Sequence, residues 1–125
     1  MNIERLLTNV CSNDLDKSKE FYVSLFNFDV DYDSDWFVHL ISKGKELELG
    51  LISETSEIVP KQAKGKISGV YLTFVVESVD ELYLKAKRLE ISILQTPENT
   101  PYGQKRMIVV APEGTVCDVS SPTSA

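Results

Sequence analysis

The sequence predicts an α+β fold of two tandem βαβββ modules. Two internal correspondences support it. A shift of 64 residues (78 − 14) carries residues 13–16 onto 77–80, and a shift of 70 (114 − 44) carries residues 44–49 onto 114–119. Self-similarity of this kind indicates a duplicated structural unit. We therefore expect a ligand to bind in the groove between the paired modules.

Length and composition limit the possible classes of protein. With 125 residues, 42% of them hydrophobic, we expect one domain: module one at about 3–53, a polar linker at 54–66 and module two at about 67–120. A net charge of −6 and a pI near 4.8 disfavour nucleic acid as a partner. No apolar run approaches the roughly 18 residues of a membrane span, and the start lacks the pattern of a signal peptide. We expect a cytoplasmic protein with no membrane partner.

Module one has clear boundary signals. Asp14 is a plausible cap for a helix over residues 15–26, and Asn27, which tolerates the left-handed conformation, would end that helix. Alternation and turn residues predict the strands of this module. These strands are expected at about 3–12, 28–32, 36–42 and 46–52, with turns at 33–35 and 43–45.

Module two repeats the plan. Ser78 and Glu81 form a capping box that opens a helix ending near Leu89. Pro97, Pro101 and Gly103 predict that residues 96–103 form an irregular loop. The strands are expected at about 68–76, 91–95, 104–111 and 116–120, with a turn at 112–114 and a tail at 122–125.

Strand alternation assigns side chains to the helix side or to the open side of each sheet. The fifth strand places its uniformly apolar set, from Val70 to Val76, against the helix, so the intervening side chains lie on the open side. The repeat places the equivalent residues of the first strand there too. In the fourth strand Leu47, Leu49 and Leu51 would face the helix. The open side is then expected to carry Leu7, Asn9, Cys11, Glu46, Glu48, Gly50, Tyr71, Thr73, Asp118 and Ser120.

The third and seventh strands are ambiguous, because both alternating sets are largely apolar. A guanidinium is costly in a helix-packed core, so Arg106 should face the open side. The 70-residue shift then places Trp36 there, and it points His39 away from the site. A structural role for His39 is the simpler interpretation, and a role as ligand or acid–base group is the alternative.

The open-side residues suggest a binding site. Carboxylates can neutralise a cation, and aromatic rings can stack on it. Glu48 and Asp118 could instead be solvated or pair with Arg106. Cys11 has no evident base to activate it, so a small buried thiol is the simpler interpretation, and Cys117 belongs to the core. Two cysteines have neither the number nor the spacing of a disulfide framework. The candidate ligand-binding residues are Asn9, Cys11, Trp36, Glu48, Tyr71, Thr73, Tyr102, Arg106 and Asp118.

Several of these segments together resemble a known superfamily. They are residues 13–18 followed by Phe21 and Tyr22, residues 77–80, and residues 101–103 before the turn at 112–114. Over about residues 3–120 the chain resembles the vicinal oxygen chelate superfamily, which includes glyoxalase I, the bleomycin-resistance proteins, fosfomycin-resistance enzymes and extradiol dioxygenases. The resemblance implies paired βαβββ modules that form a curled mixed sheet with a ligand cup. It also implies assembly that is often homodimeric, and metal ligands drawn from the first and fourth strands of each module.

Carried over to this chain, the metal positions would be Leu7, Glu48, Tyr71 and Asp118. Enzymes of the superfamily typically hold histidine, or sometimes glutamine, at the first-strand positions. Leucine has no lone pair and a neutral tyrosine is a poor ligand. We therefore expect no cofactor; if a divalent metal ion does bind, Glu48 and Asp118 would hold it.

Three functions follow from the resemblance and the residues. The first is a metal-free protein of the bleomycin-resistance kind that binds a small organic molecule, cationic or aromatic, in the cup. The second is an enzyme: a metal-dependent lyase of the glyoxalase type, a dioxygenase, or a metal-free isomerase that uses Glu48 or Asp118 as a base with its pKa raised by desolvation. The third is a protein–protein module. The sequence leaves open whether the chain is catalytic.

Overall fold

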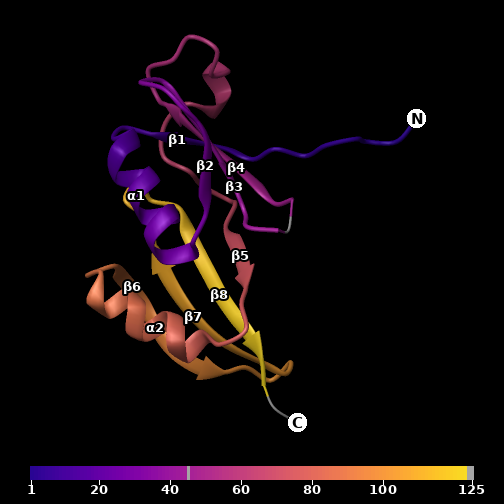
Figure 1. Ribbon diagram of the computed structural model, residues 1–125, viewed down its shortest axis with the longest axis vertical. Helices are drawn as coiled ribbons and strands as arrows, with labels where there is room; N and C mark the ends of the chain where they lie inside the picture. The colour runs from indigo at the N-terminus through magenta and orange to yellow at the C-terminus, as the bar shows by residue number, and fades with distance from the viewer. Residues whose placement is uncertain (45, 124–125) are drawn as a thin grey trace. The chain divides into compact units, whose positions relative to one another are not determined.

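The computed structural model describes residues 1–44 and 46–123, and it divides into two compact units, Met1–Ile67 and Ser68–Ala125 (Figure 1). Each unit holds one βαβββ module, so the predicted α+β duplication is confirmed. Lys45, in the expected turn at 43–45, and the last two residues of the expected tail lie outside the described residues. Neither described helix is long and apolar enough to cross a membrane.

Module one is a four-stranded sheet with a helix on one face. Its strand order is β1-β4-β3-β2, with β1 parallel to β4 and the other pairs antiparallel. Its elements are β1 (Asn9–Ser12), α1 (Leu15–Phe26), β2 (Asp29–Asp33), β3 (Phe37–Ile41), β4 (Glu48–Ser53) and a short 3-10 helix (Lys61–Ala63). The core between α1 and the sheet contains Val10, Phe21, Tyr22, Leu25, Val38, Leu40, Leu49 and Leu51.

The predicted boundaries of α1 are confirmed at both ends. The Asp14 side chain accepts a hydrogen bond from the Lys17 backbone nitrogen at 3.1 Å, which satisfies one of the unpaired N–H groups of the first turn. Asn27 ends the helix in the left-handed region at φ 61°. Both signals are local, which is why the sequence alone located this helix.

Module two repeats the arrangement with the strand order β5-β8-β7-β6. Its elements are β5 (Leu72–Val75), α2 (Val79–Arg88), β6 (Ser92–Asn99), β7 (Gln104–Val110) and β8 (Val116–Pro122). The predicted cap of α2 is confirmed, because Ser78 Oγ accepts from the Glu81 backbone nitrogen at 3.2 Å. Buried residues between α2 and the sheet include Val79, Ala86, Met107, Val109, Cys117 and Val119.

The first and fourth strands begin later than predicted. β1 begins at Asn9 and β5 at Leu72, because each is an edge strand with a single partner whose ladder starts there. β4 begins at Glu48, since Glu46 adopts a left-handed conformation with φ 55° and belongs to the turn. Leu47 and Val70, expected against the helices, are consequently 60% and 57% exposed.

The expected loop at 96–103 is partly strand. β6 continues through Pro97 to Asn99 and pairs with β7. It is an edge strand, so a residue without a backbone N–H can face solvent there, and its register shifts between Gln95 and Glu98. The proline therefore marks an irregular edge rather than the end of the strand.

Candidate functional site

The face of module one opposite α1 carries polar side chains from three strands. Asn9, Cys11 and Glu48 lie there, as predicted, because their neighbours along β1 and β4 are buried against the helix. In β3, however, Val38 and Leu40 are the buried residues, at 1% and 0% exposure. His39 therefore lies on the open face with Glu48, and the prediction that it points away was wrong.

The error came from the register of the third strand. Ile41 lies opposite Glu48 and Ile108 lies opposite Asp118, a shift of 67 residues (108 − 41) rather than 70. The β7–β8 hairpin is therefore three residues longer between these equivalent positions. Arg106 is the counterpart of His39, not of Trp36. Trp36 precedes β3, is 41% exposed, and has its ring centroid 5.6 Å from that of Phe37.

Glu48 is the centre of a hydrogen-bonded cluster in module one. Arg5 Nε donates to Glu48 Oε2 at 2.6 Å, and a second guanidinium nitrogen reaches Oε1. His39 Nε2 lies 2.7 Å from the same Oε1, and His39 Nδ1 lies 2.8 Å from Asp31 Oδ2. Asp31 is the extra residue of a bulge in β2, between the paired residues Val30 and Tyr32. Bulges re-aim side chains, and this one turns a carboxylate toward His39.

These contacts fix the charges of the cluster. Hydrogen bonds from Arg5 and then from His39 lower the pKa of Glu48 to about 2. Hydrogen bonds to Asp31 and Glu48 raise the pKa of His39 above 6.5. The alternative of Glu48 as a base with a pKa raised by desolvation is therefore not met, because the bonds from its two donors outweigh burial. Glu48 is a carboxylate throughout the neutral range.

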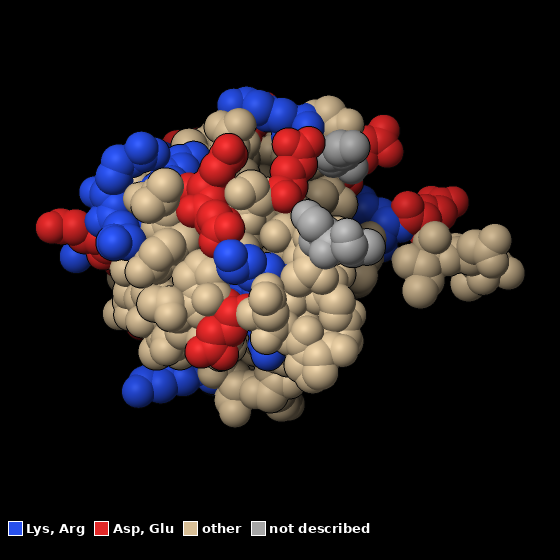
Figure 2. Space-filling view, turned by 90° about the horizontal axis from the view of Figure 1, so that it is seen from below, with Lys and Arg blue, Asp and Glu red and all other residues tan. Residues whose placement is uncertain are grey.

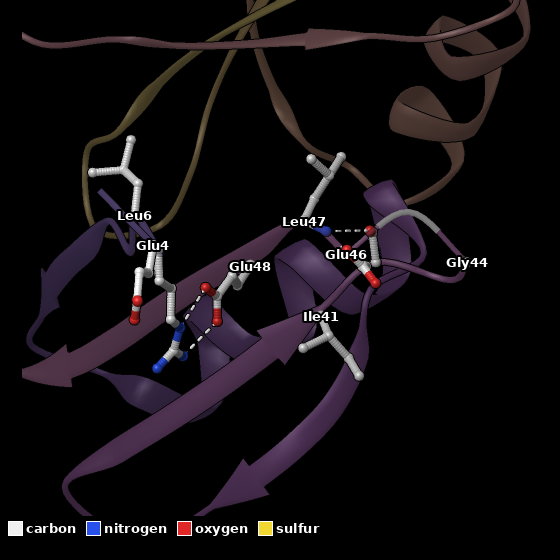
Figure 3. A pocket seen from close by; sticks show the side chains of 9 residues that line it. Glu4, Leu6, Ile41, Gly44, Glu46, Leu47 and Glu48 are labelled. Atoms are coloured by element: carbon white, nitrogen blue, oxygen red, sulfur yellow. Dashed lines mark hydrogen bonds and ion pairs between the residues drawn. The ribbon is translucent and has the colours of Figure 1, made fainter. Parts of the chain in front are cut away.

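An open pocket of about 730 Å³ adjoins Glu48 (Figure 3). In this view Glu4 and Leu6 flank Glu48 on one side, and Ile41 and Leu47 lie on the other. The lining combines apolar side chains with carboxylates and one guanidinium. It consists of Glu4, Arg5, Leu6, Ile41, Ser42, Gly44, Glu46, Leu47 and Glu48.

Module two holds the counterpart of this cluster. Arg106 Nε donates to Asp118 Oδ1 and Thr73 Oγ1 donates to Asp118 Oδ2, both at 3.0 Å. The Asp118 side chain is 11% exposed, and Thr73 lies beside it in the parallel β5–β8 ladder. Burial opposes the charge on Arg106, but the bond to Asp118, with smaller effects of Tyr102 and Tyr71, leaves the pKa of Arg106 raised.

The remaining candidate ligand-binding residues lie outside the hydrogen-bonded clusters around Glu48 and Asp118. Tyr71 and Tyr102 are 59% and 64% exposed. Cys11 Sγ lies 3.7 Å from the Ala63 carbonyl oxygen, and burial raises the pKa of its thiol, which disfavours a nucleophilic thiolate. The prediction that Cys117 belongs to the core is confirmed, since it is fully buried.

The sequence also matches the model of a known protein family. A family model described as the Glyoxalase/Bleomycin resistance protein/Dioxygenase superfamily matches residues 5–118. The chain belongs to this superfamily. No curated protein sequence matches the chain.

Solved structures show the same glyoxalase-like fold. A "conserved domain protein" is 26% identical, with a TM-score of 0.75 over 98% of this chain and 100% of its own. Lactoylglutathione lyase from Agrobacterium tumefaciens is 20% identical, with a TM-score of 0.72 over 94% of this chain and 92% of its own. The fosfomycin resistance protein FosX from Listeria monocytogenes is 14% identical, with a TM-score of 0.77 over 98% and 96%. Folds of this kind support many functions, so the function must be argued from the site.

The metal that enzymes of the superfamily use does not fit these residues. Leu7 offers no donor atom, and the phenol of Tyr71 is a poor ligand for the metals these enzymes use. Among the described residues, no three or more His, Cys, Asp or Glu side chains are grouped so that they could hold a metal ion.

Sequence reasoning missed Arg5, Asp31 and His39 as members of the Glu48 cluster. A shift of 67 residues pairs His39 with Arg106. Recognising this correspondence in the sequence would have placed His39 on the open face with Glu48. The bulge at Asp31 leaves no evident sequence signal. Arg5 meets Glu48 across 43 positions of the chain, a contact that no local pattern reports.

Proposed function

We propose that this superfamily member binds a small organic cation without a metal cofactor, using the open face of module one. The observation that carries the proposal is the ionised Glu48 carboxylate at the wall of an open pocket. A fixed negative charge selects a cationic group, and the apolar side chains of Leu6, Ile41 and Leu47 suit an organic body. The candidate residues of module two, Thr73, Arg106 and Asp118, offer a second polar surface.

An enzyme of the same superfamily is the competing proposal. A metal-free isomerase needs a base whose pKa lies near neutrality, and Glu48, with a pKa of about 2, does not meet that need. The lyase and dioxygenase versions need a metal. Metal analysis of the purified protein, with an assay on the glutathione hemithioacetal of methylglyoxal, tests them. Bound metal together with turnover would replace the binding proposal.

Fluorescence titration tests binding directly. Trp36 is the single tryptophan of the chain and it lies beside Phe37 in module one, so its emission reports on that module. We expect a saturable change with cationic polycyclic compounds or cationic glycopeptides, and a much weaker one in Glu48→Gln. The absence of a saturable response at high micromolar concentration would contradict the proposal.

Location and assembly complete the proposal. We propose a cytoplasmic homodimer whose partner is a small molecule rather than nucleic acid or a membrane. On the face shown in Figure 2, Lys and Arg groups lie among Asp and Glu groups. Light scattering coupled to size-exclusion chromatography tests the dimer, and a monomer mass near 14.0 kDa would contradict it.

A further inference from the structure

The Glu48 carboxylate is already held by a guanidinium of its own chain. Two nitrogens of Arg5 donate to the two carboxylate oxygens, the bidentate geometry that the planar guanidinium fork provides. We infer that Arg5 is an internal stand-in for the ligand, and that the pocket beside Glu48 takes a small molecule carrying an amidinium or guanidinium on an apolar body. This inference rests on the proposed function and specifies its ligand.

The two partners of the ion pair are held very differently. The Glu48 side chain is 16% exposed and is also bonded by His39, which Asp31 holds in turn. The Arg5 side chain is 60% exposed and belongs to the segment before β1. Of residues 1–7, Arg5 alone forms a hydrogen bond or ion pair with another described residue. Exposed ion pairs contribute little stability, so Arg5 can leave while the carboxylate keeps its orientation.

The pocket has room for more than the group that Arg5 supplies. Its volume of about 730 Å³ lies within the range of sites for small organic ligands. Leu6 and Leu47, which line it, are 82% and 60% exposed, so an apolar body would cover them. Glu4 and Glu46 also line it, and neither forms an ion pair with another described residue.

The equivalent ion pair in module two, between Arg106 and Asp118, cannot open in the same way. Arg106 holds Asp118 from within strand β7, and its side chain is 28% exposed. A side chain in the middle of a paired strand cannot withdraw as one on the unpaired segment before β1 can. The exchange of an internal for an external cation is therefore specific to Glu48.

Removing Arg5 should raise the affinity for the ligand, because an internal competitor reduces the fraction of protein in which Glu48 is free. The probe is benzamidine, and benzamide, which lacks the positive charge, is its matched control. We expect Arg5→Gln to bind benzamidine about tenfold more tightly than the wild type does in isothermal titration calorimetry of the full chain. Benzamide should bind no variant tightly. Adding Glu48→Gln to Arg5→Gln should abolish benzamidine binding.

Lys43→Gln is the matched control variant. It removes a positive charge from the same module, since Lys43 Nζ lies 3.4 Å from Asp29 Oδ1 in an exposed pair, and it should bind benzamidine as the wild type does. Arg5→Lys, which keeps the charge but loses the fork, should have intermediate affinity. Urea unfolding confirms that each variant is folded. If Arg5→Gln does not fold, the affinity of Arg5→Lys is compared with that of the wild type instead.

Three results would overturn the inference: equal affinity in wild type and Arg5→Gln, equal affinity for benzamide and benzamidine, or no binding of benzamidine to any variant. If other cations still change Trp36 fluorescence saturably and Arg5→Gln leaves their affinity unchanged, the inference fails while the proposed function stands. If no cation binds any variant, both fail.

Discussion

His39 and Arg106 occupy equivalent positions in their modules: each lies on the third strand, two residues from the residue opposite the fourth-strand carboxylate. His39 holds Glu48 and Arg106 holds Asp118. The duplication therefore extends from the backbone to an arrangement of a nitrogen donor and a carboxylate on the open face of each sheet. The donors differ in chemistry, since the imidazole titrates near neutral pH and the guanidinium does not.

The first prediction concerns the pKa of His39. The chain has one histidine, so its imidazole proton resonances can be followed by NMR without assignment of the other residues. We expect a pKa above 6.5 in the wild type and a lower one in Asp31→Asn, because the bond to Asp31 is the largest cause of the increase. Asp35→Asn, a charge change on the adjacent turn, should leave it unchanged. A wild-type pKa at or below 6.5 would contradict the His39 geometry.

The second prediction is the effect of this titration on stability. A raised pKa in the folded state means that folding favours protonated His39, so its contribution is complete below about pH 6.5, the ordinary pKa, and is lost as pH rises through the higher folded value. His39→Gln should therefore be less stable than the wild type near pH 5.5, with a smaller difference at about pH 8.5. Urea unfolding at both pH values measures this, and a difference that grows with pH would refute it.

The third prediction concerns Glu48 under acid conditions. Its folded pKa of about 2 lies below the ordinary 4.5, so its contribution is present above about pH 4.5 and is lost as pH falls toward 2. Glu48→Gln should lose less stability than the wild type over that interval. Glu46→Gln, which removes the same charge from an exposed neighbour, should behave as the wild type does. Unfolding curves at several pH values distinguish the two variants.

The fourth prediction concerns the buried carboxylate of module two. Arg106→Gln leaves Asp118, whose side chain is 11% exposed, with Thr73 as its remaining hydrogen-bond donor. We expect a loss of about 1–3 kcal/mol in the free energy of unfolding, measured with urea. Lys105→Gln removes the neighbouring exposed pair with Asp80 and should cost less than about 1 kcal/mol. Equal losses of unfolding free energy in the two variants would show that Arg106 contributes no more stability than the exposed Lys105.

The fifth prediction concerns Gly50, beside Asn9 in the β1–β4 ladder. A Cβ atom there would clash with Asn9 Oδ1 and lie 3.0 Å from Phe37 Cε1. Gly50→Ala should therefore lower the free energy of unfolding by about 1–2 kcal/mol, although a strand alanine would otherwise be slightly favourable. Combining it with Asn9→Ala should recover part of that loss. Simple additivity in the double variant would exclude this steric explanation.

Local signals allowed much of the fold to be predicted from the sequence alone. The caps at Asp14 and Ser78 each use a side chain and a backbone N–H three residues apart. The start of each helix can therefore be predicted from a few neighbouring residues. The alternation of β4 placed Glu48 on the open face, because Leu49 and Leu51 form its apolar set, and the internal repeat placed Asn9 there as the equivalent of Thr73. The two-module plan followed from the repeats.

Only the tertiary structure decided the partners of Glu48. Both alternating sets of β3 are largely apolar, so no pattern within that strand selects its phase, and the hairpin pairing places His39 beside the carboxylate. The bulge at Asp31 and the contact of Arg5 across 43 positions likewise depend on strand pairing and chain path. Sequence patterns report which face of a strand is buried, but the charge of a group such as Glu48 depends on neighbours that folding brings from distant positions.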